Sequence, residues 1–161
     1  VRDWMGGGEN VRTKDAAVLH QPVEAFLSMM LIDGLFERHP NLRGAAVELG
    51  AGWVPELLRR LDWVTRVYGR VDDTLRFARK PSEQLTEQMG FTPFPVEDVS
   101  VLIEQSSPDL YLFSSDYPHV EGGRDPIGKF EQYLGDADEA VKTLFYTENF
   151  LRLWPDARVH A

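Results

Sequence analysis

LYLFSSDYPHVEGG, residues 110–123, is the most informative stretch of this sequence. Its first half is apolar and predicts a buried strand from Leu110 to Ser114. The apolar run ends at Asp116, and His119 follows three residues later. In α/β barrels, the residues that carry the chemistry stand at the carboxyl ends of the strands. The stretch therefore predicts a functional carboxylate, Asp116, just beyond a strand.

A second strand and a helix are predicted upstream. The apolar run LRGAAVEL predicts a buried strand from about Arg43 to Glu48. Gly50 and Gly52 follow and favour a tight strand-to-helix turn over phosphate binding, because GAG lacks the spacing of a nucleotide loop. Apolar residues at three- and four-residue intervals then predict an amphipathic helix from Val54 to Val67.

Further helices are predicted around these strands. They cover about Pro22 to Arg38, Pro95 to Ser106, a segment starting at Asp125 and Pro126, and a last segment from near Asp136 through Phe145. Residues 71–95 are expected to form a long structured loop with a short helix over SEQLTEQM, since the prolines of FTPFP lack the donors of a central strand. Residues 1–20, with three consecutive glycines, predict a loop or flexible segment.

Composition limits the class of protein. The chain has 161 residues, 43% of them hydrophobic, which is enough for one soluble domain with a core. Its net charge is −9, and basic residues alternate with acids without a cluster that would neutralise a run of phosphates or bind an anionic membrane. We therefore expect neither nucleic acid nor membrane as a partner. The lack of cysteine, of a signal-like segment and of a spanning apolar segment favours a cytoplasmic location.

The order helix, strand, helix, helix, strand, helix, helix predicts βαβ units with parallel strands, and so the α/β class. A (β/α)8 barrel needs roughly 200 to 250 residues, so a chain of this length is expected to supply only about half of one. The prediction is a helix-rich, incomplete barrel.

Two long strings resemble a known family in combination. They are GLFERHPNLRGAAVELGAGWVPELLRRLDW, residues 34–63, and LYLFSSDYPHVEG, residues 110–122. Together they resemble the carboxyl-terminal half of the metal-dependent amidohydrolase-related family, which includes aminocarboxymuconate-semialdehyde decarboxylase and the resorcylate decarboxylases. FTPFP and the closing ENFLRLW also resemble family segments, so the resemblance spans about residues 22–153. It implies that residues 21–161 form the carboxyl-terminal part of a TIM barrel.

The resemblance also implies a metal-linked role for Asp116, which would end the last barrel strand. A catalytic divalent metal lowers the pKa of bound water, and a carboxylate beside it can both ligate the ion and accept the water's proton. Asp116 is thus the expected metal ligand and general base, with zinc the expected metal and manganese the alternative. On spacing alone, Asp116 could instead cap a helix or hold the turn before Pro118.

Three other residues are candidates. His119 could donate a proton, contact substrate or orient Asp116, or it could be a surface histidine without a role; its place in the motif favours a catalytic role. Glu48 lies where relatives carry a histidine that contacts metal or substrate, so it is a candidate for substrate binding, for metal ligation or for a plain salt bridge. Trp53 could bind substrate at a pocket mouth or simply pack.

The family's amino-terminal half supplies a His-x-His pair and a further histidine, and this chain contains neither. Because a catalytic zinc generally has three protein ligands, this chain by itself could lack the metal. Two hypotheses follow. The first is part of a metal-dependent hydrolase or non-oxidative decarboxylase acting on a small carboxylated or aromatic molecule. The alternative is a catalytically inactive half-barrel or interaction protein that covers its open edges by self-association. Under both, we expect a homo-oligomer.

Overall fold

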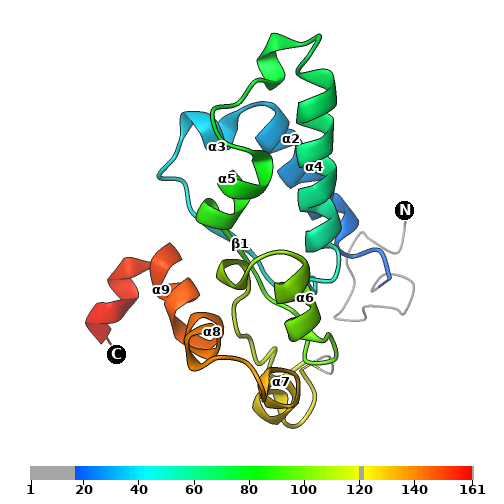
Figure 1. Cartoon of the computed structure of the whole chain (residues 1–161). Helices are drawn as coiled ribbons and strands as arrows, with labels where there is room; N and C mark the ends of the chain where they lie inside the picture. The colour runs from blue at the N-terminus through cyan, green and yellow to red at the C-terminus, as the bar shows by residue number, and fades with distance from the viewer. Residues whose placement is uncertain (1–16, 120–121, 161) are drawn as a thin grey trace, which may run out of the picture.

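The computed structural model describes residues 17–119 and 122–160 (Figure 1). Its helices are α2 (Gln21–Ile32), α3 (Leu35–Arg38), α4 (Val54–Tyr68), α5 (Pro81–Gln88), α6 (Val99–Gln105), α7 (Pro126–Leu134), α8 (Glu139–Thr143) and α9 (Asn149–Leu153). Its strands are β1 (Gly44–Ala46) and β2 (Met89–Phe91). Short turns of 3-10 helix are η2 (Asp73–Leu75), η3 (Pro108–Leu110) and η6 (Pro155–His160), and η5 (Leu144–Glu148) is a π-helical turn.

The strands are parallel neighbours although more than forty residues separate them. Gly44 pairs with Met89 and Ala46 with Phe91. Phe91 also forms a parallel bridge with Tyr111, so a third segment lies beside the pair. Parallel pairing requires a crossover, and α4 and α5 supply the first one. The predicted α/β class with parallel strands is confirmed.

The strands lie between two groups of helices. In Figure 1, α2 to α5 lie above the strand segments and α6 to α9 lie below them. One buried hydrophobic cluster contains side chains from both groups of helices and from the strands between them. Its largest members include Phe36, Leu57, Phe91, Tyr111, Phe130 and Phe145. The strand residues Ala46, Phe91 and Tyr111 belong to this cluster, so the core fixes the position of the strand ends.

The sequence prediction was wrong about the strands in three respects. The strand expected from Arg43 to Glu48 is confined to β1, and the one expected from Leu110 to Ser114 is a single bridge at Tyr111. Residues 89–91, expected in a loop, form β2. The prolines of FTPFP do not obstruct β2, because the strand ends at Phe91, before the first of them.

The predicted helices exist, with shifted boundaries. The first is divided into α2 and α3, because Gly34 takes a left-handed conformation with φ +71°. α6 starts at Val99 and not at Pro95, since the Asp98 carboxylate accepts hydrogen bonds from the Ser100 and Val101 amides and so caps the helix there. The short helix over SEQLTEQM is confirmed as α5.

Two expectations concern the chain ends and the membrane. The loop or flexible segment predicted for residues 1–20 lies outside the described residues except for 17–20, which form a turn. Within the described residues, no helix combines the length and apolar character needed to cross a membrane.

Candidate metal centre

Asp116 lies five residues beyond the bridge at Tyr111, in the loop that leaves the third strand segment. Its backbone has φ +53°, a left-handed conformation that few residues other than glycine adopt. The Asp116 amide donates to Ser114 Oγ at 3.3 Å. The side chain is only 5% exposed, so the loop holds this carboxylate against the protein.

His119 closes the same turn. Its amide donates to the Asp116 carbonyl at 2.8 Å, and this contact turns the chain back so that the two side chains meet. His119 Nδ1 lies 3.5 Å from Asp116 Oδ1, while the imidazole is 57% exposed. The histidine does face Asp116, although Pro118 stands between them.

Glu48 reaches the same place from the end of β1. Its φ is +59°, and its amide donates to Thr92 Oγ1 at 3.2 Å, which ties it to the loop after β2. Glu48 Oε1 lies 3.9 Å from His119 Nδ1. Left-handed conformations of residues other than glycine cost free energy and cluster at functional sites. Glu48 and Asp116 are the two such residues in the described part of the chain, and both belong to this centre.

The three side chains can serve as ligands of one cation. One donor atom from each of Glu48, Asp116 and His119 lies within 4.8 Å of the others. Two donors on one tetrahedral zinc lie roughly 3.4 Å apart when each is about 2.0–2.2 Å from the ion. The His119–Asp116 distance of 3.5 Å meets this requirement, and the Glu48–His119 distance of 3.9 Å exceeds it by an amount that an exposed side chain can close. Two carboxylates and an imidazole suit zinc or manganese, so the residues fit a divalent metal.

Glu97 organises the loop that carries Glu48, and sequence reasoning missed it. Its carboxylate accepts from the amides of Ala51 at 2.9 Å, Gly52 at 2.7 Å and Phe94 at 2.7 Å. The first two amides precede α4 and the third belongs to the loop after β2, so one side chain joins the two strand-end loops. The prediction placed Glu97 inside a helix that starts at Pro95, whereas it precedes the helix. The one signal in the sequence for this role was an acidic residue, Glu97, two positions after the FTPFP segment.

The predicted turn glycines are confirmed in that role. Gly50 has φ +64°, and a Cβ there would stand 3.0 Å from Phe94 and 3.1 Å from the Glu97 carboxylate. The turn after β1 thus needs glycine both for its conformation and for its close approach to Glu97.

Trp53 packs into the structure. Its indole N–H donates to the Gly50 carbonyl at 3.0 Å, and its ring is stacked on His20 and edge-on to Phe91. It is half-buried and contributes no donor atom to the group formed by Glu48, Asp116 and His119. Its expected contact with substrate stays a prediction.

Tyr111, which bridges to β2 ahead of the Asp116 loop, is fully buried. Burial raises its pKa to about 12, against the opposing effect of a hydrogen bond with Ser106. The Tyr111 hydroxyl lies 2.7 Å from Ser106 Oγ and donates to the Leu102 carbonyl at 3.3 Å. The phenol therefore anchors the third strand segment to α6.

The family follows from comparison with known proteins. The model of the amidohydrolase family matches residues 16–155, which is most of the sequence, and the chain belongs to this family. This confirms the resemblance inferred from the two long strings. A search of curated proteins returned no match.

Two solved structures resemble the fold. The amidohydrolase map2389c of Mycobacterium avium subsp. paratuberculosis K-10 matches with a TM-score of 0.72 and 27% identity, over 94% of this chain and 38% of that one. The 5-carboxyvanillate decarboxylase LigW of Sphingomonas paucimobilis matches with a TM-score of 0.58 and 24% identity, over 80% of this chain and 38% of that one. The chain therefore spans well under half of either protein.

Proposed function

We propose that this chain is the carboxyl-terminal part of a metal-dependent amidohydrolase-family barrel enzyme that acts on a small carboxylated or aromatic molecule. The observation that carries the proposal is the meeting of Glu48, Asp116 and His119 at the ends of two parallel strand segments. Family membership supports metal dependence. The fold shared with a decarboxylase supports non-oxidative decarboxylation as an alternative to hydrolysis.

Each residue has a distinct role in this proposal. A bound divalent metal would lower the pKa of a water molecule and polarise a substrate oxygen. Asp116 would ligate the metal and accept the proton of the attacking water, because its carboxylate is held against the protein. His119 would either hold the metal through Nδ1 or, with that nitrogen free 3.5 Å from the carboxylate, pass the proton on or deliver it to the substrate. Glu48 completes the ligand set or orients His119.

A complete site requires further ligands on a barrel portion that this chain does not contain. The two solved relatives are each more than twice as long as the matched segment. Three parallel strand segments with covering helices fit part of a (β/α)8 barrel, whose active sites lie at the carboxyl ends of the strands. Glu48 and Asp116 follow such ends.

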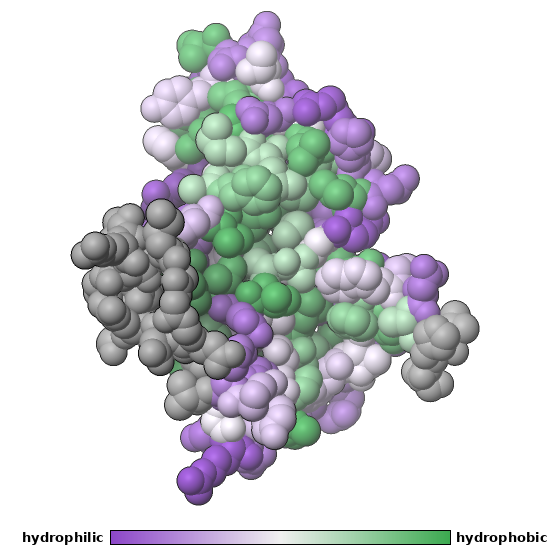
Figure 2. Space-filling model, turned by 180° about the vertical axis from the view of Figure 1, so that it is seen from behind, coloured by the Kyte–Doolittle hydropathy of each residue, from purple (hydrophilic) through white to green (hydrophobic). Residues whose placement is uncertain are grey.

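The second candidate is a catalytically inactive half-barrel that self-associates. Its support is exposed apolar surface: Phe26 is 62% and Met29 59% exposed on α2, and Val47 is 55% exposed next to Glu48. Figure 2 shows hydrophobic residues gathered across the middle of one face. Apolar surface of this kind marks a contact with another chain or with the rest of a barrel.

Metal analysis of the purified chain distinguishes the two candidates. For the enzyme, we expect close to one zinc or manganese per chain after dialysis against limiting metal. Asp116→Asn should abolish this binding, whereas Asp136→Asn, which makes the same change at an exposed position, should leave it intact. A folded chain that takes up no metal, or that loses equal amounts in both variants, would favour the inactive half-barrel.

A further inference from the structure

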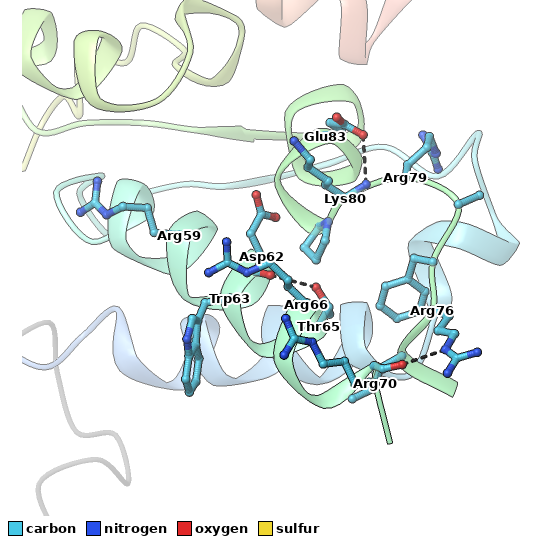
Figure 3. A pocket seen from close by; sticks show the side chains of 15 residues that line it. Arg59, Asp62, Trp63, Thr65, Arg66, Arg70, Arg76, Arg79, Lys80 and Glu83 are labelled. Atoms are coloured by element: carbon cyan, nitrogen blue, oxygen red, sulfur yellow. Dashed lines mark hydrogen bonds between the residues drawn. The ribbon is translucent and has the colours of Figure 1, made fainter. Parts of the chain in front are cut away.

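A sizeable pocket lies far from the candidate metal centre. It encloses about 850 Å³ and is formed by the second half of α4, the loop through η2 and the start of α5 (Figure 3). Arg66 lies about 18 Å along the helix axis from Val54, the residue at which α4 leaves the metal-centre loop. The pocket and the metal centre are therefore at opposite ends of this helix.

Cations dominate the lining. Six basic side chains face two acidic ones: Arg59, Arg66, Arg70, Arg76, Arg79 and Lys80 against Asp62 and Glu83. The whole chain carries a net charge of −9, so this concentration is opposite in sign to the rest of the molecule. The basic residues are spread along the sequence, and the fold brings those of α4 and of residues 69–80 together around one cavity.

The two acids are already engaged by the start of α5. The Asp62 carboxylate accepts from the Ser82 amide at 2.8 Å and from Ser82 Oγ at 2.7 Å. Glu83 accepts from the Lys80 amide at 3.0 Å. Both therefore stabilise the amino end of the helix.

Three of the six cations have acidic partners outside the pocket. Arg59 pairs with Glu56, Arg76 with Asp73 and Arg79 with Glu87. Within the described part of the chain, Arg66, Arg70 and Lys80 form no ion pair. In Figure 3, Arg66 and Arg70 lie on one side of the pocket and Lys80 on the other. The pocket thus presents three available cations from two facing walls.

We propose that this pocket binds a small organic anion with clustered anionic oxygens, such as a phosphate ester or a polycarboxylate. Guanidinium groups bind such oxygens in a bidentate manner, and lysine adds a point charge. The volume falls in the range of pockets for small organic molecules, and Phe77 and Pro81 supply apolar wall for a carbon skeleton. A nucleic acid backbone fits less well, because the cations surround a hollow and the net charge of −9 repels a polyanion.

Titration calorimetry on the whole chain tests the proposal, with inorganic pyrophosphate and citrate as probes and sodium chloride at matched ionic strength as the baseline. We expect saturable binding of one probe per chain. The double substitution Arg66→Ala, Arg70→Ala should weaken it about tenfold or more, given the usual strength of charged hydrogen bonds. Lys80→Ala, on the facing wall, should weaken it as well.

Arg60→Ala is the matched control, because Arg60 is exposed on the same helix, pairs with Glu56 and does not line the pocket. It should change the affinity less than twofold, and circular dichroism should show that all variants stay folded. Whichever probe binds more tightly identifies the phosphate or the carboxylate form of the ligand. Equal weakening by Arg60→Ala and the double substitution, no saturable binding, or tighter binding of a single-stranded oligonucleotide than of either probe would overturn the proposal.

Discussion

Glu48 and Asp116 have left-handed backbones after β1 and after the third strand segment, which lie on either side of β2. The turn after β1 aims Glu48 towards His119, and the turn after the third segment aims Asp116 there. A left-handed residue with a Cβ costs roughly 1–2 kcal/mol relative to glycine. We infer that the chain tolerates this cost because the conformation brings the carboxylates to a common site.

This leads to a prediction at position 48. Glu48→Ala keeps the strained backbone, whereas Glu48→Gly relieves it, so the glycine variant should be more stable than the alanine variant by about 1 kcal/mol. Urea unfolding of the two variants measures the difference. Both should bind metal more weakly than the unchanged chain. An alanine variant as stable as the glycine variant would show that the backbone is not strained.

Tyr111 provides a pH prediction. Its pKa is raised to about 12 in the folded chain, from about 10 in the unfolded chain. Between these values the folded state retains a proton that the unfolded state has lost, so stability is fully present below pH 10 and falls as the pH rises through 12. The loss should be about 3 kcal/mol, because each pKa unit corresponds to about 1.4 kcal/mol.

Denaturant unfolding at pH 9 and at the highest accessible alkaline pH measures the effect. Tyr146, whose pKa burial also raises, contributes a loss in the same direction. The comparison with Tyr111→Phe isolates the Tyr111 part, since phenylalanine has no proton to lose. A fall that is equally steep in the variant would contradict the assignment.

At the scale of elements, Glu97 holds the two strand-end loops in register. Glu97→Gln presents an amide N–H where the carboxylate accepted backbone hydrogen bonds, so the Ala51, Gly52 and Phe94 amides cannot all stay paired. We expect a loss of about 2 kcal/mol in unfolding free energy. Hydrogen exchange should accelerate at these three amides.

Glu104→Gln is the control for this prediction, because Glu104 is an exposed acid on the neighbouring helix α6. It should change neither stability nor exchange. Unaltered exchange at Ala51, Gly52 and Phe94 in the Glu97 variant would mean that other contacts hold the loops.

The elements also show how far the sequence could be interpreted. The hydrophobic period of α4 and the proline and aspartate at the start of α7 are local signals, so these helices were predicted correctly. β2 has only three residues with a glycine in the middle, which is too short for an alternating hydrophobic pattern to predict it. Gly90 is explained only by packing, because a Cβ would stand 2.7 Å from Leu112 and from Leu153.

In the candidate site, too, the local motif could be predicted from the sequence, whereas the contacts between distant segments could not. Asp116 and His119 share one motif and were found together. Their contact with Glu48 depends on the pairing of distant segments, and its role stayed open among three alternatives. The ties from Glu97 and Thr92 to the β1 turn are interactions between residues more than forty positions apart, which no local pattern reveals.

At the scale of the whole molecule, the exposed apolar side chains of α2 indicate a contact with another protein surface. If the chain associates with itself or with the remainder of a barrel through α2, polar residues at Phe26 and Met29 should weaken that association at least tenfold, in line with the area each side chain exposes. Sedimentation of the chain with Phe26→Ser and Met29→Ser over a concentration series tests this.

Val96→Ser is the matched control, because Val96 is 76% exposed but lies in the loop before α6. It should leave association unchanged. A chain that is monomeric at every concentration, or variants that all associate equally, would contradict a role for this face of α2.

The central claim is that Asp116, His119 and Glu48 form a metal centre, and the imidazole nitrogens of His119 report on it most directly. Nitrogen-15 spectra of the histidine rings should be recorded during a zinc titration of the whole chain and of Asp116→Asn. We expect the His119 ring signals to move, with saturation at one zinc per chain, while those of His39 stay fixed, and we expect Asp116→Asn to abolish the change. If zinc leaves the His119 signals unmoved, or shifts them equally without the Asp116 carboxylate, these residues do not form a common metal centre.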